Sequence, residues 1–205
     1  HVGISIKMDY NTSANGGSSS YTTDIPPALY NNFGYDAGIQ IYQRKYLQYE
    51  AWENILITEL DARRPVLYRG STADNAGHIF VCDGYDANGL FHLNWGWGGS
   101  SNGYFEISAM NPDGPGIGSG NDGYNLGHYI VTGIQKPVSG SVHASLVAID
   151  SISPSQRTIP RTGSVTLSIK KLMNVGAFDY LSSIMGTALI LSQNGVTIDT
   201  LLVDK

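Results

Sequence analysis

The sequence predicts an α+β fold followed by the beginning of an all-β, immunoglobulin-like sandwich. Before Pro65, apolar residues recur at three- and four-residue spacing, which indicates helices. After Pro65 they alternate or form short runs bounded by glycines, which indicates strands. Beyond Pro137 the pattern is typical of strands alone. We therefore expect two domains, residues 1–137 and residues 138–205, with the second one incomplete because such sandwiches usually need about 100 residues.

The helices are expected in the first part of the chain. A short element over residues 1–10 and a polar loop over residues 11–23 come first. Asp24, followed by two prolines, then predicts the start of a helix, because an acid suits the N-cap and proline suits the first turn. This helix should end at Gly34. A second, amphipathic helix is predicted from about Tyr49 to Arg63.

The strands follow in order along the rest of the chain. Besides a central hairpin within residues 77–99, the sequence predicts a glycine-rich loop over residues 111–125 and an Asn194-Gly195 turn between the last two strands. The predicted strands outside the hairpin are 66–68, 104–107, 129–132, 144–152, 164–170, 187–192 and 196–203.

Composition and charge argue against several classes of protein. The chain has 205 residues, of which 41% are hydrophobic and 14% charged, as in a packed globular protein. Its net charge of −5 and the absence of a Lys/Arg cluster argue against binding to nucleic acid. No apolar run approaches the ~20 residues of a membrane span. A single cysteine, Cys82, excludes an internal disulfide and a cysteine-rich metal site, and we expect no metal or cofactor.

The hairpin within residues 77–99 brings one histidine, one asparagine and two tryptophans into one short stretch. With a five-residue loop at residues 84–88, His78 faces Asn94 at a Cβ separation of about 5 Å. With a tight Asn88-Gly89 turn, Asn94 misses His78 by about five residues. We favour the first alternative, because a histidine that acts as a base needs a polar partner to fix its tautomer.

His78 is the candidate base, and its surroundings have two interpretations. Trp95 and Trp97 either shield the histidine and line a substrate groove or belong to the core. The glycines that alternate with and follow them allow the backbone to approach a ligand closely. An isolated histidine of this kind is more often a buried, hydrogen-bonded one, but the pairing with Asn94 beside two tryptophans favours a functional role.

Cys82 is not expected to be a nucleophile. Four residues along a strand span about 13 Å, whereas a Cys–His pair needs about 3 Å. Cys82 is therefore expected to be a small buried hydrophobic residue. The sequence also has no G-x-S-x-G, H-E-x-x-H or phosphate-loop motif, so serine hydrolase, zinc peptidase and nucleotide chemistry are not indicated.

Five segments resemble the C-terminal half of the streptopain family of secreted bacterial cysteine peptidases, which has the papain-like fold. They are VGISIKMDY at 2–10, NNFGY at 31–35, GHIFVCDGYD at 77–86, NWGWGGSSNGYFEI at 94–107 and AMNP at 109–112. The resemblance implies that His78 is the catalytic base and Asn94 its orienting partner, with Gly77, Trp95 and Trp97 on the substrate side. It also implies protein or peptide substrates and a secreted or cell-surface location.

The resemblance leaves the nucleophile unaccounted for. The family's cysteine belongs to an N-terminal helix before the position of His1, so we expect a partner, an N-terminal half that carries it. The start at His1 rather than methionine suggests a processed or trimmed fragment. The alternatives are a catalytically inactive fragment and a β binding module, rich in tyrosine and tryptophan, for peptides or glycans.

Overall fold

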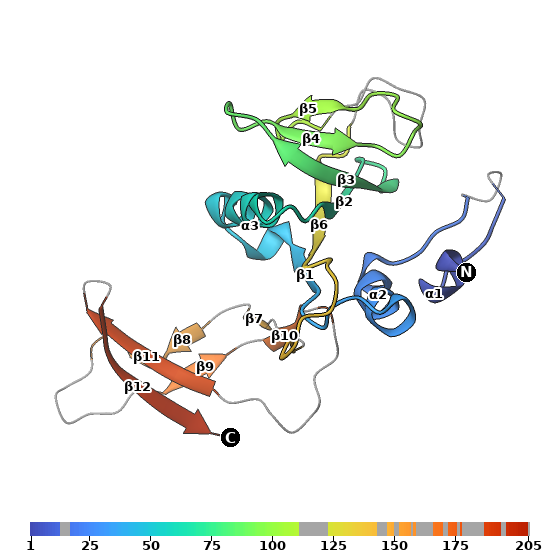
Figure 1. Cartoon of the computed structure of the whole chain (residues 1–205). Coiled ribbons are helices and arrows are strands. Elements are labelled where there is room, and N and C mark those ends of the chain that lie inside the picture. The colour runs from blue at the N-terminus through green and yellow to red at the C-terminus, as the bar shows by residue number, and fades with distance from the viewer. Residues whose placement is uncertain are drawn as a thin grey trace.

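The centre of the protein is a six-stranded sheet with the order β1-β6-β2-β3-β4-β5, in which all neighbouring strands are antiparallel (Figure 1). The computed structural model describes residues 1–12, 17–110 and 123–142 and short segments between residues 147 and 204. The sheet is built from β1 Gln40–Gln43, β2 Val66–Ser71, β3 Gly77–Tyr85, β4 Phe91–Asn94, β5 Gly103–Phe105 and β6 Leu126–Thr132.

Three α-helices accompany the sheet, and two of them match the predicted helices closely. They are α1 Val2–Ser5, α2 Ile25–Phe33 and α3 Tyr49–Asp61; two short 3₁₀-helices span Thr22–Asp24 and Arg44–Tyr46. Helix α2 ends at Gly34, whose φ of 68° is left-handed and therefore suits glycine. Asp24 is the N-cap residue, as predicted, but its side chain makes no capping hydrogen bond and instead accepts one from Lys7 Nζ at 2.7 Å.

The two longer helices cover opposite faces of the sheet, each over its own hydrophobic cluster. Trp52 and Leu56 of α3 pack with Tyr68, Phe80 and Cys82 of β2 and β3. On the other face, Ile25 of α2 packs with Ile39 and with residues of β1 and β6, namely Ile41 and Val131. Because side chains alternate along a strand, even-numbered residues of β3 face α3 and odd-numbered ones face α2. No helix in the described part of the chain is long and apolar enough to cross a membrane.

The register of the hairpin β3–β4 differs from both predicted alternatives. Val81 pairs with Asn94 and Cys82 with Leu93, and Asp83 forms a bulge, after which Gly84 pairs with His92. The loop between the strands is residues 86–90, which is later than the favoured loop at 84–88 and includes the Asn88-Gly89 pair of the other alternative. Within this loop, the Asp86 carboxylate accepts hydrogen bonds from the backbone N–H groups of Asn88 and Leu90, each at 2.9 Å. Asn94 therefore does not face His78, which instead pairs with Gly70 of β2.

The bounds of several other strands also differ from the predicted ones. The predicted strand at 104–107 is β5, which stops at Phe105, while Ile107 is buried outside the strand. Strand β6 begins before the predicted 129. Strand β1 has no counterpart among the predicted strands. The glycine-rich loop falls largely on residues outside the described part of the chain, as do residues 13–16 of the polar loop and the Asn194-Gly195 turn.

The described strands beyond residue 142 form three antiparallel pairs, β7 with β10, β8 with β9 and β11 with β12. The predicted strand at 144–152 corresponds to two strands, and β10 was not predicted. The bounds are β7 Val147–Ile149, β8 Ile152–Pro154, β9 Leu167–Ile169, β10 Leu172–Asn174, β11 Thr187–Gln193 and β12 Val196–Asp204. Each pair forms a separate two-stranded sheet in the described part of the chain, so the immunoglobulin-like sandwich stays a prediction.

Asp36 ties the segment around residue 138 to the loop that precedes β1. Its buried carboxylate accepts hydrogen bonds from Val138 N at 2.6 Å, from Gly38 N at 2.7 Å and from the Ser141 hydroxyl. These hydrogen bonds, that of Ser141 first, lower the pKa of the carboxyl from its usual value of 3.8. The charged form of Asp36 thus fixes the chain at the boundary between the two expected domains.

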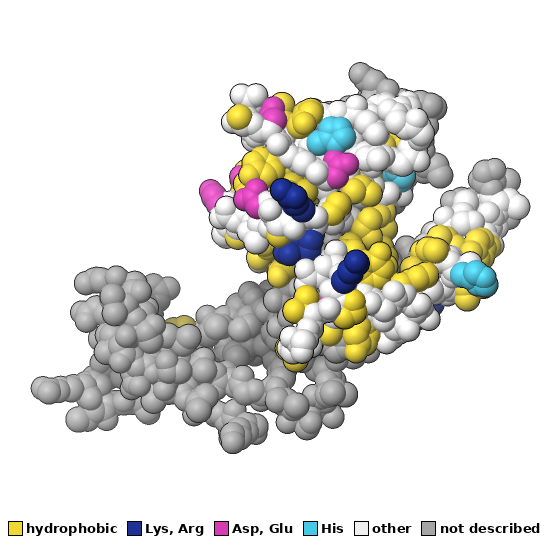
Figure 2. All heavy atoms as spheres, in the orientation of Figure 1, with side chains coloured by type: hydrophobic (Ala, Val, Ile, Leu, Met, Phe, Trp, Pro, Cys, Tyr) yellow, Lys and Arg dark blue, Asp and Glu magenta, His cyan; other side chains and the backbone are white. Residues whose placement is uncertain are grey.

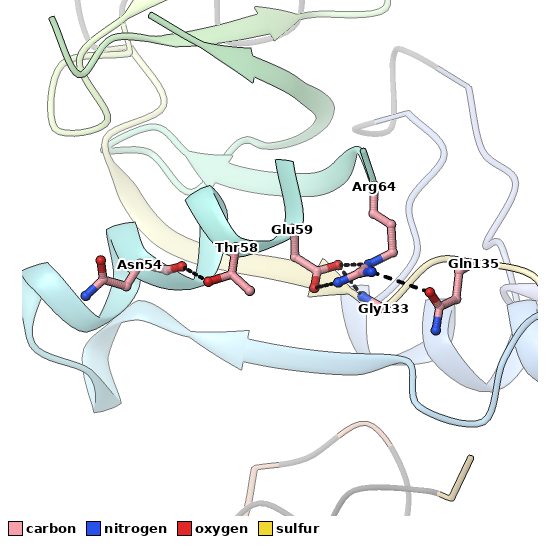
Figure 3. Close-up of polar contacts among 6 residues, drawn as sticks. All are labelled: Asn54, Thr58, Glu59, Arg64, Gly133 and Gln135. Carbon is pink, nitrogen blue, oxygen red and sulfur yellow. Dashed lines mark hydrogen bonds and ion pairs between the residues drawn. The ribbon is translucent and has the colours of Figure 1, made fainter. Parts of the chain in front are cut away.

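A second polar contact anchors the end of α3 (Figure 3). Glu59, which is buried, receives hydrogen bonds from Arg64 Nη2 at 2.7 Å and Nε at 2.9 Å and from Gly133 N at 2.8 Å. The paired geometry is the strong form of a carboxylate–guanidinium contact, and it raises the pKa of Arg64. Since Gly133 directly follows β6, this contact fixes α3 relative to the sheet.

We expect Asp36→Asn to destabilise the protein at neutral pH and to matter less as the pH falls. The folded-state pKa is lowered, so the stabilisation is complete above the pKa of an unfolded aspartate and is lost as the pH falls through the folded-state value. Urea unfolding of wild type and variant between about pH 3 and pH 7 measures the difference. Exposed Glu106→Gln is the control. A difference in unfolding free energy that does not change with pH would contradict this assignment.

We expect Arg64→Met to lower the free energy of unfolding by about 2–3 kcal/mol, because it leaves the Glu59 carboxylate buried without its cation. The neighbouring Arg63 is exposed, and Arg63→Met should stay within about 0.5 kcal/mol of wild type. Thermal or denaturant unfolding distinguishes the two, and equal effects of both substitutions would show that the Glu59 contact does not stabilise the fold.

Candidate active site

His78 lies at the start of β3, at an edge of the sheet beyond the end of β4. Its partner on β2 is Gly70, and the glycine is required there by space. A Cβ placed on Gly70 would lie 2.4 Å from the backbone oxygen of Tyr124 and 2.7 Å from its Cβ. The close approach brings the Tyr124 ring to 5.4 Å from the His78 ring.

The imidazole of His78 is held by one hydrogen bond and by aromatic contacts. Nε2 lies 2.8 Å from the backbone oxygen of Trp95. The Trp97 ring stacks on the imidazole at 5.1 Å and an interplanar angle of 24°, and the Trp95 ring lies at 6.4 Å. A carbonyl can only accept, so Nε2 carries the proton, and the neutral ring presents Nδ1 as its basic nitrogen. The arrangement fixes both the tautomer and the orientation of a potential base.

Asn94 directly precedes Trp95, but its side chain hydrogen-bonds the backbone of Gly96 and not the His78 imidazole. It shares a face of the sheet with Val81, whereas His78 shares the opposite face with Phe80. Its Oδ1 accepts a hydrogen bond from Gly96 N at 3.0 Å. The orienting contact predicted from the Asn94 side chain is made instead by the Trp95 carbonyl, and Asn94 supports the turn that follows that carbonyl.

The turn after β4 depends on glycine. Gly96, Gly98 and Gly99 have φ angles of 76°, 64° and 90°, in the left-handed region that side chains with a Cβ disfavour. Asn102 Oδ1 accepts a hydrogen bond from Trp95 N at 3.1 Å and closes the same turn. The turn reverses the chain so that Trp97 reaches the His78 ring. The sequence had predicted another role for these glycines, the close approach of the backbone to a ligand, and that role stays a prediction.

The two tryptophans have different environments. Trp95 is 0% exposed and belongs to the α3-side core with Phe80, Leu93 and Tyr124. Trp97 is half-buried and packs on that cluster from outside. Of the two alternatives raised by the sequence, core residue or wall of a groove, Trp95 fits the first. Trp97 packs against the core and the His78 ring, and its place in a groove wall stays a prediction.

Cys82 is a buried residue, as predicted. It is 0% exposed in the α3-side core, and burial, the larger cause, raises the pKa of its thiol to about 12. Phe80 lies between it and His78 on the same face of β3. Phe80 therefore separates the Cys82 thiol from the His78 imidazole.

A groove of about 760 Å³ opens beside His78, lined by Gly77, His78 and Ile79 of β3 and by the N-terminal part of the chain. We call it the β3 groove; it also involves Arg69 of β2, residues 18–22 and α2. On the face shown in Figure 2, hydrophobic side chains gather between the sheet and the N-terminal helices. Ser18, Ser19 and Ser20, which belong to the predicted polar loop, also line the β3 groove.

The other histidines of the sheet have structural partners. His92 Nδ1 lies 2.5 Å from Asp83 Oδ1, and His128 Nδ1 lies 2.6 Å from the Tyr68 hydroxyl. Burial lowers the pKa of His128. No group of three or more possible metal ligands of the His, Cys, Asp or Glu type occurs in the described part of the chain.

Comparison with known proteins places this chain in a peptidase family. The peptidase C10 family matches residues 1–105. Streptopain of Streptococcus pyogenes serotype M28 is 40% identical over 134 residues, which are 65% of this chain and 33% of streptopain. The thiol protease/hemagglutinin PrtT of Porphyromonas gingivalis is 38% identical over 134 residues, 65% of this chain and 15% of that protein.

A solved structure agrees with this relationship. Active wild-type interpain A cysteine protease of Prevotella intermedia aligns with a TM-score of 0.56 and 30% identity, over 66% of this chain and 53% of its own. The chain belongs to the peptidase C10 family, and the streptopain-like resemblance seen in its motifs is confirmed. It spans a third of the length of streptopain and less of PrtT.

We expect Cys82 to resist iodoacetamide while the protein is folded. With a thiol pKa of about 12, only about one molecule in ten thousand carries the thiolate at pH 8, and the side chain is also closed to the reagent. Intact mass should therefore stay unchanged in buffer and rise by one adduct in denaturant. Rapid modification of the folded chain would show that Cys82 is accessible.

Proposed function

We propose that this chain is the C-terminal part of a secreted cysteine endopeptidase of the streptopain type, with His78 as its base and with the nucleophilic cysteine outside residues 1–205. The observation that carries the proposal is the hydrogen bond from His78 Nε2 to the Trp95 carbonyl at 2.8 Å. It leaves Nδ1 as the basic nitrogen of the imidazole, and residue His78 borders the β3 groove.

The chemistry would be acyl transfer. A thiolate from the absent cysteine, paired with the His78 imidazolium, attacks a peptide carbonyl, and the tetrahedral intermediate collapses when His78 gives its proton to the leaving amine. His78 then takes a proton from water, which attacks the thioester and releases the acid. The donors that stabilise the oxyanion would come mainly from the N-terminal half.

The remaining predicted residues receive supporting roles in this proposal. Asn94 acts through the turn, because its bond to Gly96 N holds the peptide that follows the Trp95 carbonyl. Trp97 covers one face of the imidazole, and Trp95 fixes the carbonyl from inside the core. Gly77 lines the β3 groove next to His78, and its missing side chain leaves space that the Arg69 guanidinium occupies.

The domain organisation and location belong to the same proposal. Residues 1–137 would form part of a papain-like peptidase domain and residues 138–205 part of a β-sandwich accessory domain. The similarity to bacterial thiol proteases supports protein or peptide substrates and a bacterial protein that is secreted or displayed at the cell surface.

We expect a longer protein that includes the preceding segment to hydrolyse casein and to lose this activity on treatment with a thiol alkylator. His78→Ala should lower kcat/KM by about 10³-fold or more, because both proton transfers depend on the imidazole. His92→Ala, which removes a histidine bound to Asp83, is the matched control and should keep the activity.

Two outcomes would contradict the proposal. Full activity of His78→Ala would remove the base from the mechanism. Loss of alkylator sensitivity in Cys82→Ala would place the nucleophile inside this chain. A longer protein that binds peptides or glycans without hydrolysing them would favour the alternative of a binding module.

A further inference from the structure

Arg69 is a cation that the sheet holds at the β3 groove. It lies on β2, where it pairs with Ile79 of β3 on one side and with Tyr129 of β6 on the other. Its side chain lines the β3 groove together with Gly77 and His78 and also lines a smaller hollow of about 160 Å³ beside residues 20–23. The guanidinium therefore lines the same groove as residue His78, from the sheet face of Ile79, opposite the face that carries the imidazole.

Two glycines make room for this guanidinium. A Cβ placed on Gly77 would lie 3.0 Å from Arg69 Nη2, and one placed on Gly127 would lie 2.7 Å from Nη1. Nη1 donates a hydrogen bond to the Gly127 oxygen at 2.6 Å, and the guanidinium carbon lies 5.5 Å from the centre of the Tyr129 ring. The group is thus fixed by backbone, by one hydrogen bond and by an aromatic face.

The charge of Arg69 has no carboxylate partner in the part of the chain that the structure describes. The ion pairs there join Lys7 to Asp24, Arg64 to Glu59 and His92 to Asp83. Lys7, the other cation of the β3 groove, is therefore already paired. Asp9 also lines the groove, but it forms no ion pair with Arg69. Nη2 and Nε of Arg69 can still donate to a ligand, because the described hydrogen bond uses Nη1.

We propose that Arg69 binds an acidic side chain of the peptide substrate and so gives the protein a preference for glutamate or aspartate close to the scissile bond. This inference rests on the proposed function, since it places the substrate in the β3 groove. Nη2 lies against Gly77, the residue before His78, and an extended peptide advances about 3.3 Å per residue. The acidic residue would therefore lie within about two positions of the bond that reaches His78.

The fixed geometry favours a carboxylate over a neutral group. A guanidinium presents paired N–H groups that match the two oxygens of a carboxylate, which a lysine ammonium does not. Because Arg69 is already immobilised, binding costs little further side-chain entropy. A charge-assisted hydrogen bond of this kind discriminates against an uncharged amide by about tenfold or more.

The test measures binding by the 205-residue chain, so it does not depend on catalysis. Acetylated and amidated hexapeptides of alanine and glycine carry either one glutamate or one glutamine, placed at each position in turn. Titration followed by NMR or by tryptophan fluorescence gives their affinities. The variants are Arg69→Met, Arg69→Lys and, as a matched control, Lys136→Met, which removes the same charge from an exposed side chain outside the groove.

We expect wild type and Lys136→Met to bind the best glutamate peptide about tenfold more tightly than its glutamine counterpart. This ratio should fall to about one in Arg69→Met and lie between the two values in Arg69→Lys. Equal affinities in wild type, the absence of saturable binding or an unchanged ratio in Arg69→Met would each overturn the inference. A preserved ratio together with full peptidase activity of His78→Ala would overturn the proposed function and leave the acidic subsite standing.

Discussion

The packing of Trp95 joins the core to the site. Its ring is completely buried among Phe80, Phe105 and Tyr124, and its backbone oxygen holds the imidazole of His78. Burying a side chain of this size contributes several kcal/mol to folding, so the carbonyl is fixed by the same interaction that stabilises the sheet. The orientation of the proposed base is therefore a property of the hydrophobic core.

The hydrogen-bonding partner of His78 is a backbone carbonyl, and it was therefore not predicted correctly from the sequence. A sequence pattern shows only which side chains could meet across the hairpin, and Asn94 is the polar side chain that it offers to His78. A backbone carbonyl is present at every residue and carries no sequence signal. The register also depended on a bulge at Asp83 and on the bonds of Asp86 within its turn, both of which reflect local geometry more than periodicity.

Much of the fold was nevertheless predictable where a single local sequence signal determines the structure. Helix α2 has prolines in its first turn and Gly34 after its end, and α3 has a regular apolar face, so both were found closely. Strand β1 was missed because it is short and its Gln40 and Gln43 do not stand out as strand formers. In the site, Trp97 and the glycines were identified from the motif. Tyr124 was not, because it reaches His78 only where the segment before β6 packs against Gly70 of β2.

Gly70 illustrates how a position without any functional group can constrain a site. It has no side chain to offer, yet the backbone of Tyr124 fills the space where a Cβ would be. A larger residue at position 70 would push Tyr124 away from β2, and the Tyr124 ring would then move away from the His78 imidazole. The position therefore requires glycine for the geometry of the site, although glycine has no group that could take part in a reaction. The requirement for glycine at position 70 comes from the lack of space for a side chain and not from chemical reactivity.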